Sequence, residues 1–119
     1  MRPIKVAEVD LTDLSILFTE ETKCDILIGH YAQGGAAIMI QTTETQEPVA
    51  TFTRYIRPVA PYHVLIDTNN NPKALEILIK NGVVKPQLLD NVPSGYCIYP
   101  EFELSDMVIE KLKNYTDYV

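Results

Sequence analysis

The sequence predicts an α+β protein with a mainly antiparallel sheet, a meander of about 4 to 6 strands. One helix is expected to pack on one face of the sheet, and a short helix is expected at the C-terminus. Segments rich in β-branched and aromatic residues follow one another through residues 24–67, with connections too short for repeated βαβ crossovers. Helical periodicity begins only at Asn71, after those segments.

The first two β-rich segments predict a hairpin. Residues 24–31 and 36–40 are apolar runs, and the stretch between them contains Gln33, Gly34 and Gly35. Glycine adopts the positive φ values that tight turns require, so this stretch indicates a turn between two antiparallel strands.

A third strand is expected over residues 49–56, which would extend the hairpin into a meander. Alternation along this segment places Phe52 and Arg54 on one face. Pro58 and Pro61 are expected to end the strand, because proline cannot donate a hydrogen bond to a neighbouring strand.

Two later segments complete the predicted sheet. Residues 63–67 read as a fourth short strand, and residues 96–104 read as another strand after a turn at residues 92–95. Pro100 interrupts the last of these, which predicts an edge position for that strand.

A helix is predicted over residues 72–80. Asn71 is suited to cap it with its side-chain oxygen, and Pro72 suits the first helical position. Asn81 and Gly82 follow as a C-terminal stop, because glycine adopts the left-handed conformation there at little cost.

The two ends of the chain carry weaker patterns. Ser105 is expected to cap a last helix over residues 106–115, which has a narrow apolar stripe. Residues 5–11 alternate weakly between apolar and polar side chains, and residues 14–18 are apolar enough to form a strand.

Length and composition indicate one domain that spans residues 1–119. The chain has a mass of 13.4 kDa, with 46% apolar and 22% charged residues, as in an ordinary globular domain. Its apolar runs are shorter than the roughly 20 residues that cross a bilayer, and the N-terminus lacks a secretory signal pattern. We therefore expect a cytoplasmic protein that does not bind membranes.

The net charge of −6 and the pI of about 4.8 disfavour direct binding to nucleic acid, which depends on Lys and Arg. Acidic residues outnumber basic ones in residues 1–47 and 86–119, and the balance reverses in residues 48–85. Acidic ends of this kind favour a basic protein partner. The candidate partner-binding residues are Glu8, Asp10, Asp13, Glu20, Glu21, Glu101 and Glu103.

One basic and aromatic cluster gives an alternative. Arg54, Tyr55 and Arg57 interleave cationic and aromatic side chains, and Lys73 adds a further positive charge. Aromatic and basic residues on one face bind single-stranded nucleic acid, so these four residues form an alternative nucleic-acid surface if they share a face.

Titratable residues offer a second alternative, a small enzyme. His30 and His63 each lie beside a tyrosine, and Cys24 or Cys97 could meet one of them across a sheet to form a nucleophile and base pair. Glu101 and Glu103, on one side of a predicted strand, could instead act as a pair of catalytic carboxylates. The spacings match no zinc motif, and the glycines match no phosphate-binding loop. We therefore assign no catalytic residue, metal or cofactor.

Six short motifs follow one another along residues 24–104: Gly29–Gly35, Ala37–Gln41, Glu47–Thr53, Ala74–Leu78, Asn81–Val84 and Val92–Tyr96. In this order they resemble the motifs of a small bacterial and phage domain family of unknown function. The resemblance leaves residues 1–23 as an N-terminal extension and residues 105–119 as the C-terminal helix. The family is carried by phages, plasmids and conjugative elements, so the resemblance implies an accessory role in the cytoplasm of a bacterial host cell.

These observations favour a small acidic, non-enzymatic binding protein of a phage or mobile element. It would inhibit a host defence protein, in the manner of an anti-CRISPR or anti-restriction protein. The exposed edges of a β-rich fold also allow a homodimer, because two edge strands can pair across a two-fold axis.

Overall fold

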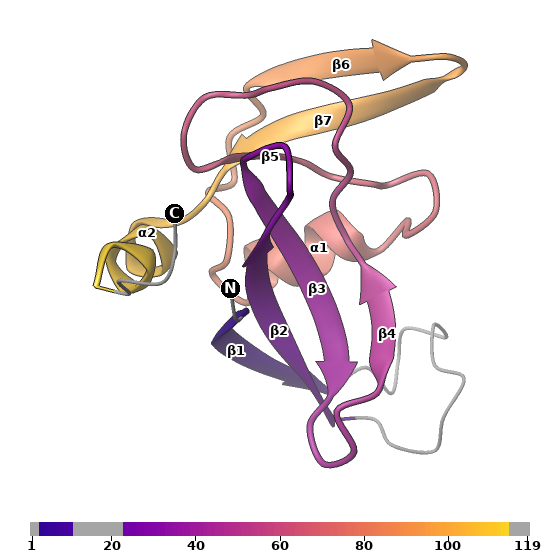
Figure 1. Cartoon of the computed structure of the whole chain (residues 1–119). Helices are drawn as coiled ribbons and strands as arrows, with labels where there is room; N and C mark the ends of the chain where they lie inside the picture. The colour runs from indigo at the N-terminus through magenta and orange to yellow at the C-terminus, as the bar shows by residue number, and fades with distance from the viewer. Residues whose placement is uncertain (1–2, 11–22, 115–119) are drawn as a thin grey trace.

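The computed structural model describes residues 3–10 and 23–114 and shows two antiparallel sheets, with α1 behind the first sheet and α2 at one side (Figure 1). The predicted α+β class is confirmed. The elements are β1 (Ile4–Asp10), β2 (Lys23–His30), β3 (Ala36–Thr42), β4 (Pro48–Thr51), β5 (His63–Leu65), α1 (Ala74–Lys80), β6 (Asp90–Ser94), β7 (Cys97–Glu103) and α2 (Asp106–Lys113).

The first sheet has the order β1-β2-β3-β4, so it contains the first three strands of the predicted meander. The segments at residues 63–67 and 96–104, which were expected to complete this sheet, instead supply β5 and β7 of a second sheet. β2 and β3 form the expected hairpin, in which His30 pairs with Ala36. Its loop is closed by two hydrogen bonds of 2.9 Å, from the Tyr31 N–H to the Gly35 carbonyl and from the Gly34 N–H to the Tyr31 carbonyl. Gly34 and Gly35 have φ values of 101° and 93°, which explains why glycine occupies both positions.

The second sheet has the order β5-β7-β6, so β7 is its central strand. The prediction that Pro100 marks an edge strand is therefore wrong. The Pro100 carbonyl accepts a hydrogen bond from the Ile66 N–H, 2.9 Å away and just beyond the end of β5. A proline is tolerated there because its missing N–H falls where the β5 ladder stops.

The predicted turn at residues 92–95 is also misplaced, because most of that segment belongs to β6. Ser94 pairs with Cys97, which leaves Gly95 and Tyr96 as a two-residue turn between β6 and β7. Gly95 has a φ of 59° at the first central position, as a type II′ hairpin turn requires.

The predicted third strand over residues 49–56 is shorter than expected, because the chain leaves the first sheet after Thr51. Phe52 still donates its N–H to the Ile38 carbonyl of β3, whereas Thr53 forms a bridge with Ile66 beside β5. Phe52 is buried and Arg54 is exposed, so the two side chains do not share an environment. This crossing joins the two sheets.

α1 begins at Ala74, two residues later than predicted, and Asn71 does not cap it. The Asn71 side chain instead donates to the Thr51 carbonyl at 3.0 Å. The expected C-terminal stop is present. The Gly82 N–H donates to Ile79 and the Val83 N–H donates to Leu78, the two bonds of a Schellman motif.

α2 is capped by Ser105, whose Oγ accepts a hydrogen bond from the Val108 N–H at 3.3 Å, as the sequence predicts. Both helices contribute to one core that also draws on both sheets. The largest fully buried side chains in this core include Phe52, Ile26, Ile28, Ile38, Ile40, Ile66, Leu78, Leu104 and Leu112.

The weak alternation over residues 5–11 corresponds to β1. The strand expected over residues 14–18 and the end of the last predicted helix, at residue 115, lie outside the described residues. Neither helix within the described part of the chain has the length and apolar character that a membrane span requires.

Candidate functional site

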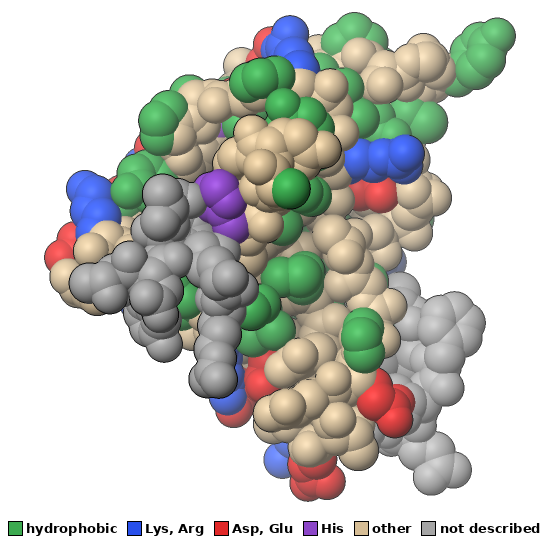
Figure 2. Space-filling view, in the orientation of Figure 1, with side chains coloured by type: hydrophobic (Ala, Val, Ile, Leu, Met, Phe, Trp, Pro, Cys, Tyr) green, Lys and Arg blue, Asp and Glu red, His purple; other side chains and the backbone are tan. Residues whose placement is uncertain are grey.

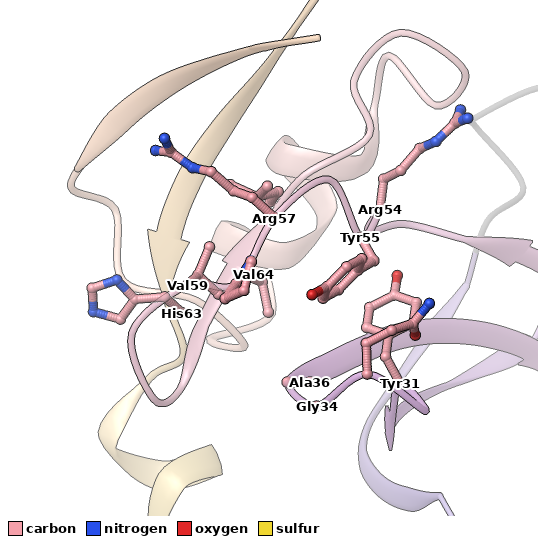
Figure 3. A pocket seen from close by; sticks show the side chains of 13 residues that line it. Tyr31, Gly34, Ala36, Arg54, Tyr55, Arg57, Val59, His63 and Val64 are labelled. Carbon is pink, nitrogen blue, oxygen red and sulfur yellow. The ribbon is translucent and has the colours of Figure 1, made fainter.

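A cavity of about 230 Å³ opens between the β2–β3 hairpin loop and the segment that joins β4 to β5 (Figure 3). We term it the tyrosine cavity, because Tyr31 and Tyr55 form one of its walls. Their ring centroids are 5.9 Å apart with an interplanar angle of 59°, which is in the favourable range for tilted aromatic rings. Val59, Val64 and Leu65 add apolar surface to the lining.

The position of Tyr31 depends on Thr53, the residue at which the chain crosses between the sheets. The Tyr31 hydroxyl lies 2.8 Å from Thr53 Oγ1, and the Ile38 N–H donates to the same oxygen at 3.1 Å. Burial raises the pKa of the Tyr31 phenol above its ordinary value of about 10. The phenol is therefore neutral at physiological pH and serves as an ordered wall of the cavity.

Arg54 and Arg57 also line the tyrosine cavity, so the structure brings together three of the four residues of the alternative nucleic-acid surface. Figure 3 shows both guanidinium groups extending outward from the cavity, in different directions. Arg57 Nη2 is 3.4 Å from Asp90 Oδ2, and both side chains are exposed.

Lys73 is not part of this group. It lies in a separate groove of about 490 Å³ that is also lined by Glu8, Asp10 and Lys80. Its Nζ is 3.7 Å from Glu76 Oε2. The four basic and aromatic residues that the sequence grouped together therefore lie at two places on the molecule.

The described residues of the predicted acidic surface are also divided between two sheets. Glu8 and Asp10 lie on β1, and Glu101 and Glu103 lie on β7. Glu103 Oε1 accepts a hydrogen bond from Lys85 Nζ at 2.9 Å. Asp13, Glu20 and Glu21 lie outside the described residues.

Glu101 is largely buried, with 13% of its side chain exposed, and its Oε2 lies 2.6 Å from His63 Nδ1. Figure 3 shows the His63 ring directed away from the two tyrosines. The contact therefore connects β5 to β7 rather than projecting a base into the cavity.

The histidines and cysteines of the enzyme alternative are separated within each sheet. Cys24 and His30 lie six residues apart on β2, roughly 20 Å at the rise of a strand. His63 pairs with Glu103, which is also six residues from Cys97 along β7. Within residues 3–10 and 23–114, no three His, Cys, Asp or Glu side chains are grouped so that they could hold a metal ion.

The β6–β7 hairpin carries an exposed apolar surface that the sequence interpretation did not identify. Figure 2 shows hydrophobic side chains on the projecting end of this hairpin. Tyr96 at the turn is fully exposed and Ile98 is 55% exposed. We term these two residues, together with the exposed Leu88 and Leu89 directly before β6, the hairpin surface.

One signal in the sequence points to the hairpin surface. Ser94, Gly95 and Tyr96 form a tight turn with an aromatic residue at its tip, where the fold offers no cover. A turn predicted at residues 92–95 hides this signal, because it places Tyr96 in the strand that follows rather than at the tip of the turn.

The fold defines a small α+β protein with two antiparallel sheets on one core. Comparison with family models, with curated proteins and with solved structures finds no match to this chain. The tyrosine cavity and the hairpin surface are therefore the features from which its function is inferred.

Proposed function

We propose that this chain is a small, non-enzymatic binding protein that engages a partner protein through the hairpin surface. The observation that carries the proposal is the distribution of exposed apolar side chains. Of the five large hydrophobic residues that are exposed in the described part of the chain, Tyr96 and Ile98 lie on the β6–β7 hairpin, Leu88 and Leu89 lie directly before β6, and Met107 lies on α2. A concentration of exposed apolar groups of this kind marks an interaction site.

Tyr96 is the expected centre of the contact. Tyrosine combines a large apolar ring with a hydroxyl group, and it is enriched among the residues that dominate binding energy at interfaces. Its position on a two-residue turn, anchored by the pairing of Ser94 with Cys97, limits the conformational entropy lost on binding.

The contact is expected to use side chains rather than an added strand. β6 is the edge of its sheet, and Pro93 lies within it. The closing pair Ser94–Cys97 is hydrogen-bonded, and hydrogen-bonded pairs alternate with non-hydrogen-bonded pairs along the hairpin. Pro93–Ile98 is therefore a non-hydrogen-bonded pair, and the Pro93 nitrogen faces away from β7. An edge that lacks this donor is a poor template for strand addition.

The proposed partner is a basic host protein, with a defence protein as the proposed target. The net charge of −6 would accelerate association with a positively charged partner. The motif order in residues 24–104, which resembles a family carried on phages and mobile elements, supports a target in the bacterial host.

The test is site-specific photo-crosslinking in the bacterium that carries the gene. A photoreactive amino acid replaces Tyr96 in one chain and Met107 in another, since Met107 is 42% exposed on α2 and outside the hairpin surface. We expect a discrete cross-linked protein from position 96 and none from position 107.

The cross-linked protein is then purified and its affinity is measured with Tyr96→Ser and Met107→Ser chains. We expect Tyr96→Ser to weaken binding by at least about 30-fold, as for a dominant interface residue, and Met107→Ser to leave it unchanged. Equal cross-linking at both positions, or equal affinity of both variants, would overturn the proposal.

A further inference from the structure

The tyrosine cavity has a lining charge opposite to that of the whole chain. Its 13 lining residues include Arg54 and Arg57, and none of them is Asp or Glu. The chain as a whole has 16 acidic and 10 basic residues. A cavity without carboxylates in an acidic protein favours an anionic ligand.

The size and the walls of the cavity suit one planar ring. A volume of about 230 Å³ is below the roughly 300–1,000 Å³ of sites that enclose drug-sized ligands. The wall made by Tyr31 and Tyr55 and the apolar surface of Val64 and Leu65 offer aromatic and aliphatic contact to a ring.

The two arginines are available for an anionic group at the cavity mouth. Arg54 forms no ion pair within 4.0 Å with any carboxylate of the described residues. Besides burial, the charge of Asp67 raises the pKa of the Tyr31 phenol and the charge of Arg54 lowers it. Arg57 has one partner, Asp90, at 3.4 Å and exposed to solvent. Exposed pairs of this kind contribute little energy, so a ligand can replace Asp90 at small cost.

We propose that the tyrosine cavity binds a small aromatic anion, a planar ring that bears a phosphate or carboxylate group, such as a mononucleotide. The ring would lie against Tyr55 inside the cavity. The anionic group would remain at the mouth, where rotation of the Arg54 and Arg57 side chains brings their guanidinium groups to it. Guanidinium groups suit this role because they bind phosphate and carboxylate in a bidentate manner.

A free ligand is favoured over a nucleic-acid strand by the surrounding charge. A strand requires a continuous basic track along its backbone. Lys73 is separated from the cavity and lies in a groove with Glu8 and Asp10. The positive charge at the cavity is therefore that of Arg54 and Arg57.

Calorimetric titration of the full chain tests the proposal with probes that separate the ring from the charge. Adenosine monophosphate, uridine monophosphate and phenyl phosphate carry both features, adenosine carries only the ring, and inorganic phosphate carries only the charge. We expect at least one of the first three to bind with a Kd below 1 mM, and at least about tenfold more tightly than adenosine and inorganic phosphate.

Arg54→Gln and Arg57→Gln are expected to weaken that binding by about tenfold each, the usual loss for a hydrogen bond to a charged group. Lys73→Gln removes the same charge outside the cavity and should leave binding unchanged. Arg54 and Arg57 are exposed, so these variants are expected to retain the fold, which their urea midpoints will verify.

Three results would overturn the proposal: no binding of any ring-bearing anion at millimolar concentration, an equal loss with Lys73→Gln, or tighter binding of a 15-residue oligothymidylate than of every small probe. The last result would assign the cavity to single-stranded nucleic acid. None of these results bears on the hairpin surface, because the cavity uses different residues. Arg54→Gln chains should still bind the partner protein, so measuring that binding distinguishes the two proposals.

Discussion

The hydroxyl group of Tyr31 lies 2.8 Å from Oγ1 of Thr53, across 22 positions of sequence, and this contact connects the loop of the first hairpin to the segment that crosses between the sheets. Thr53 Oγ1 also accepts the Ile38 N–H at 3.1 Å. One buried hydroxyl therefore satisfies a backbone donor of β3 and orients a wall of the tyrosine cavity.

Thr53→Val is expected to lower the free energy of unfolding by about 1–3 kcal/mol. Valine has nearly the same shape, but it leaves the Ile38 N–H without an acceptor in the core. Urea denaturation measures the change, with Thr51→Val as the control because the Thr51 side chain is exposed. Equal midpoints for the two variants would show that the Thr53 hydroxyl adds nothing to stability.

The raised pKa of Tyr31 predicts a loss of stability at alkaline pH. The phenol ionises more readily in the unfolded chain than in the folded protein. Its contribution to the free energy of unfolding is therefore complete below about pH 10 and is lost as the pH rises through the pKa of Tyr31 in the folded protein. Tyr31→Phe should therefore show a shallower decline in urea midpoint above pH 10 than the unaltered chain.

Tyr96→Phe is the matched control for that titration, because Tyr96 is fully exposed at the hairpin turn. The urea midpoint of Tyr96→Phe should decline above pH 10 as steeply as that of the unaltered chain. The buried phenol of Tyr99, whose pKa is also raised, contributes to the decline in both proteins. If the urea midpoints of Tyr31→Phe and Tyr96→Phe decline in parallel above pH 10, burial of Tyr31 does not govern the loss of stability at alkaline pH.

Gly82→Ala is expected to destabilise the fold by about 1–2 kcal/mol, because Gly82, the residue directly after the C-cap of α1, has a φ of 68°. A methyl group at this position would contact nothing within 4 Å, so the cost comes from the backbone alone. Gly82→Asn should cost less, since asparagine tolerates this conformation. The order of thermal midpoints, glycine above asparagine above alanine, checks the prediction.

Pro93→Val is expected to increase self-association. The substitution restores an outward N–H on the edge strand β6, next to the exposed side chain of Ile98. Sedimentation velocity over a range of concentrations should show more dimer or larger species than the unaltered chain. Pro86→Val, an exposed position before β6, is the control, and equal behaviour of both variants would mean that Pro93 does not protect the edge.

Local patterns predicted the elements whose formation depends on nearby residues. The β2–β3 hairpin follows from two apolar runs around Gly34 and Gly35, and α2 follows from Ser105 and a helical apolar stripe. The end of α1 at Gly82 follows from a conformation that glycine adopts most easily. Each of these signals acts over a few residues, so a single sequence contains it.

The elements that were misjudged depend on partners distant in the sequence. Pro100 lies in a central strand because the β5 ladder ends beside it, and Asn71 bonds to Thr51 instead of capping α1. The candidate site shows the same division. The sequence joined Arg54, Tyr55 and Arg57 as near neighbours, but it also included Lys73, which the fold places in another groove.

The amino-acid order alone determined the α+β class, the first hairpin, the end of α1 before Gly82 and the start of α2 at Ser105. Glycine conformation, capping and apolar spacing are local properties, so a single sequence contains them. Tertiary structure decided which strands became central, which carboxylates contact a cation, and that Tyr31 and Tyr55 form one wall of a cavity. The wall that Tyr31 contributes to the cavity depends on Thr53, where the chain changes sheets, and a contact across 22 positions is set by the packing of the whole core rather than by any local pattern.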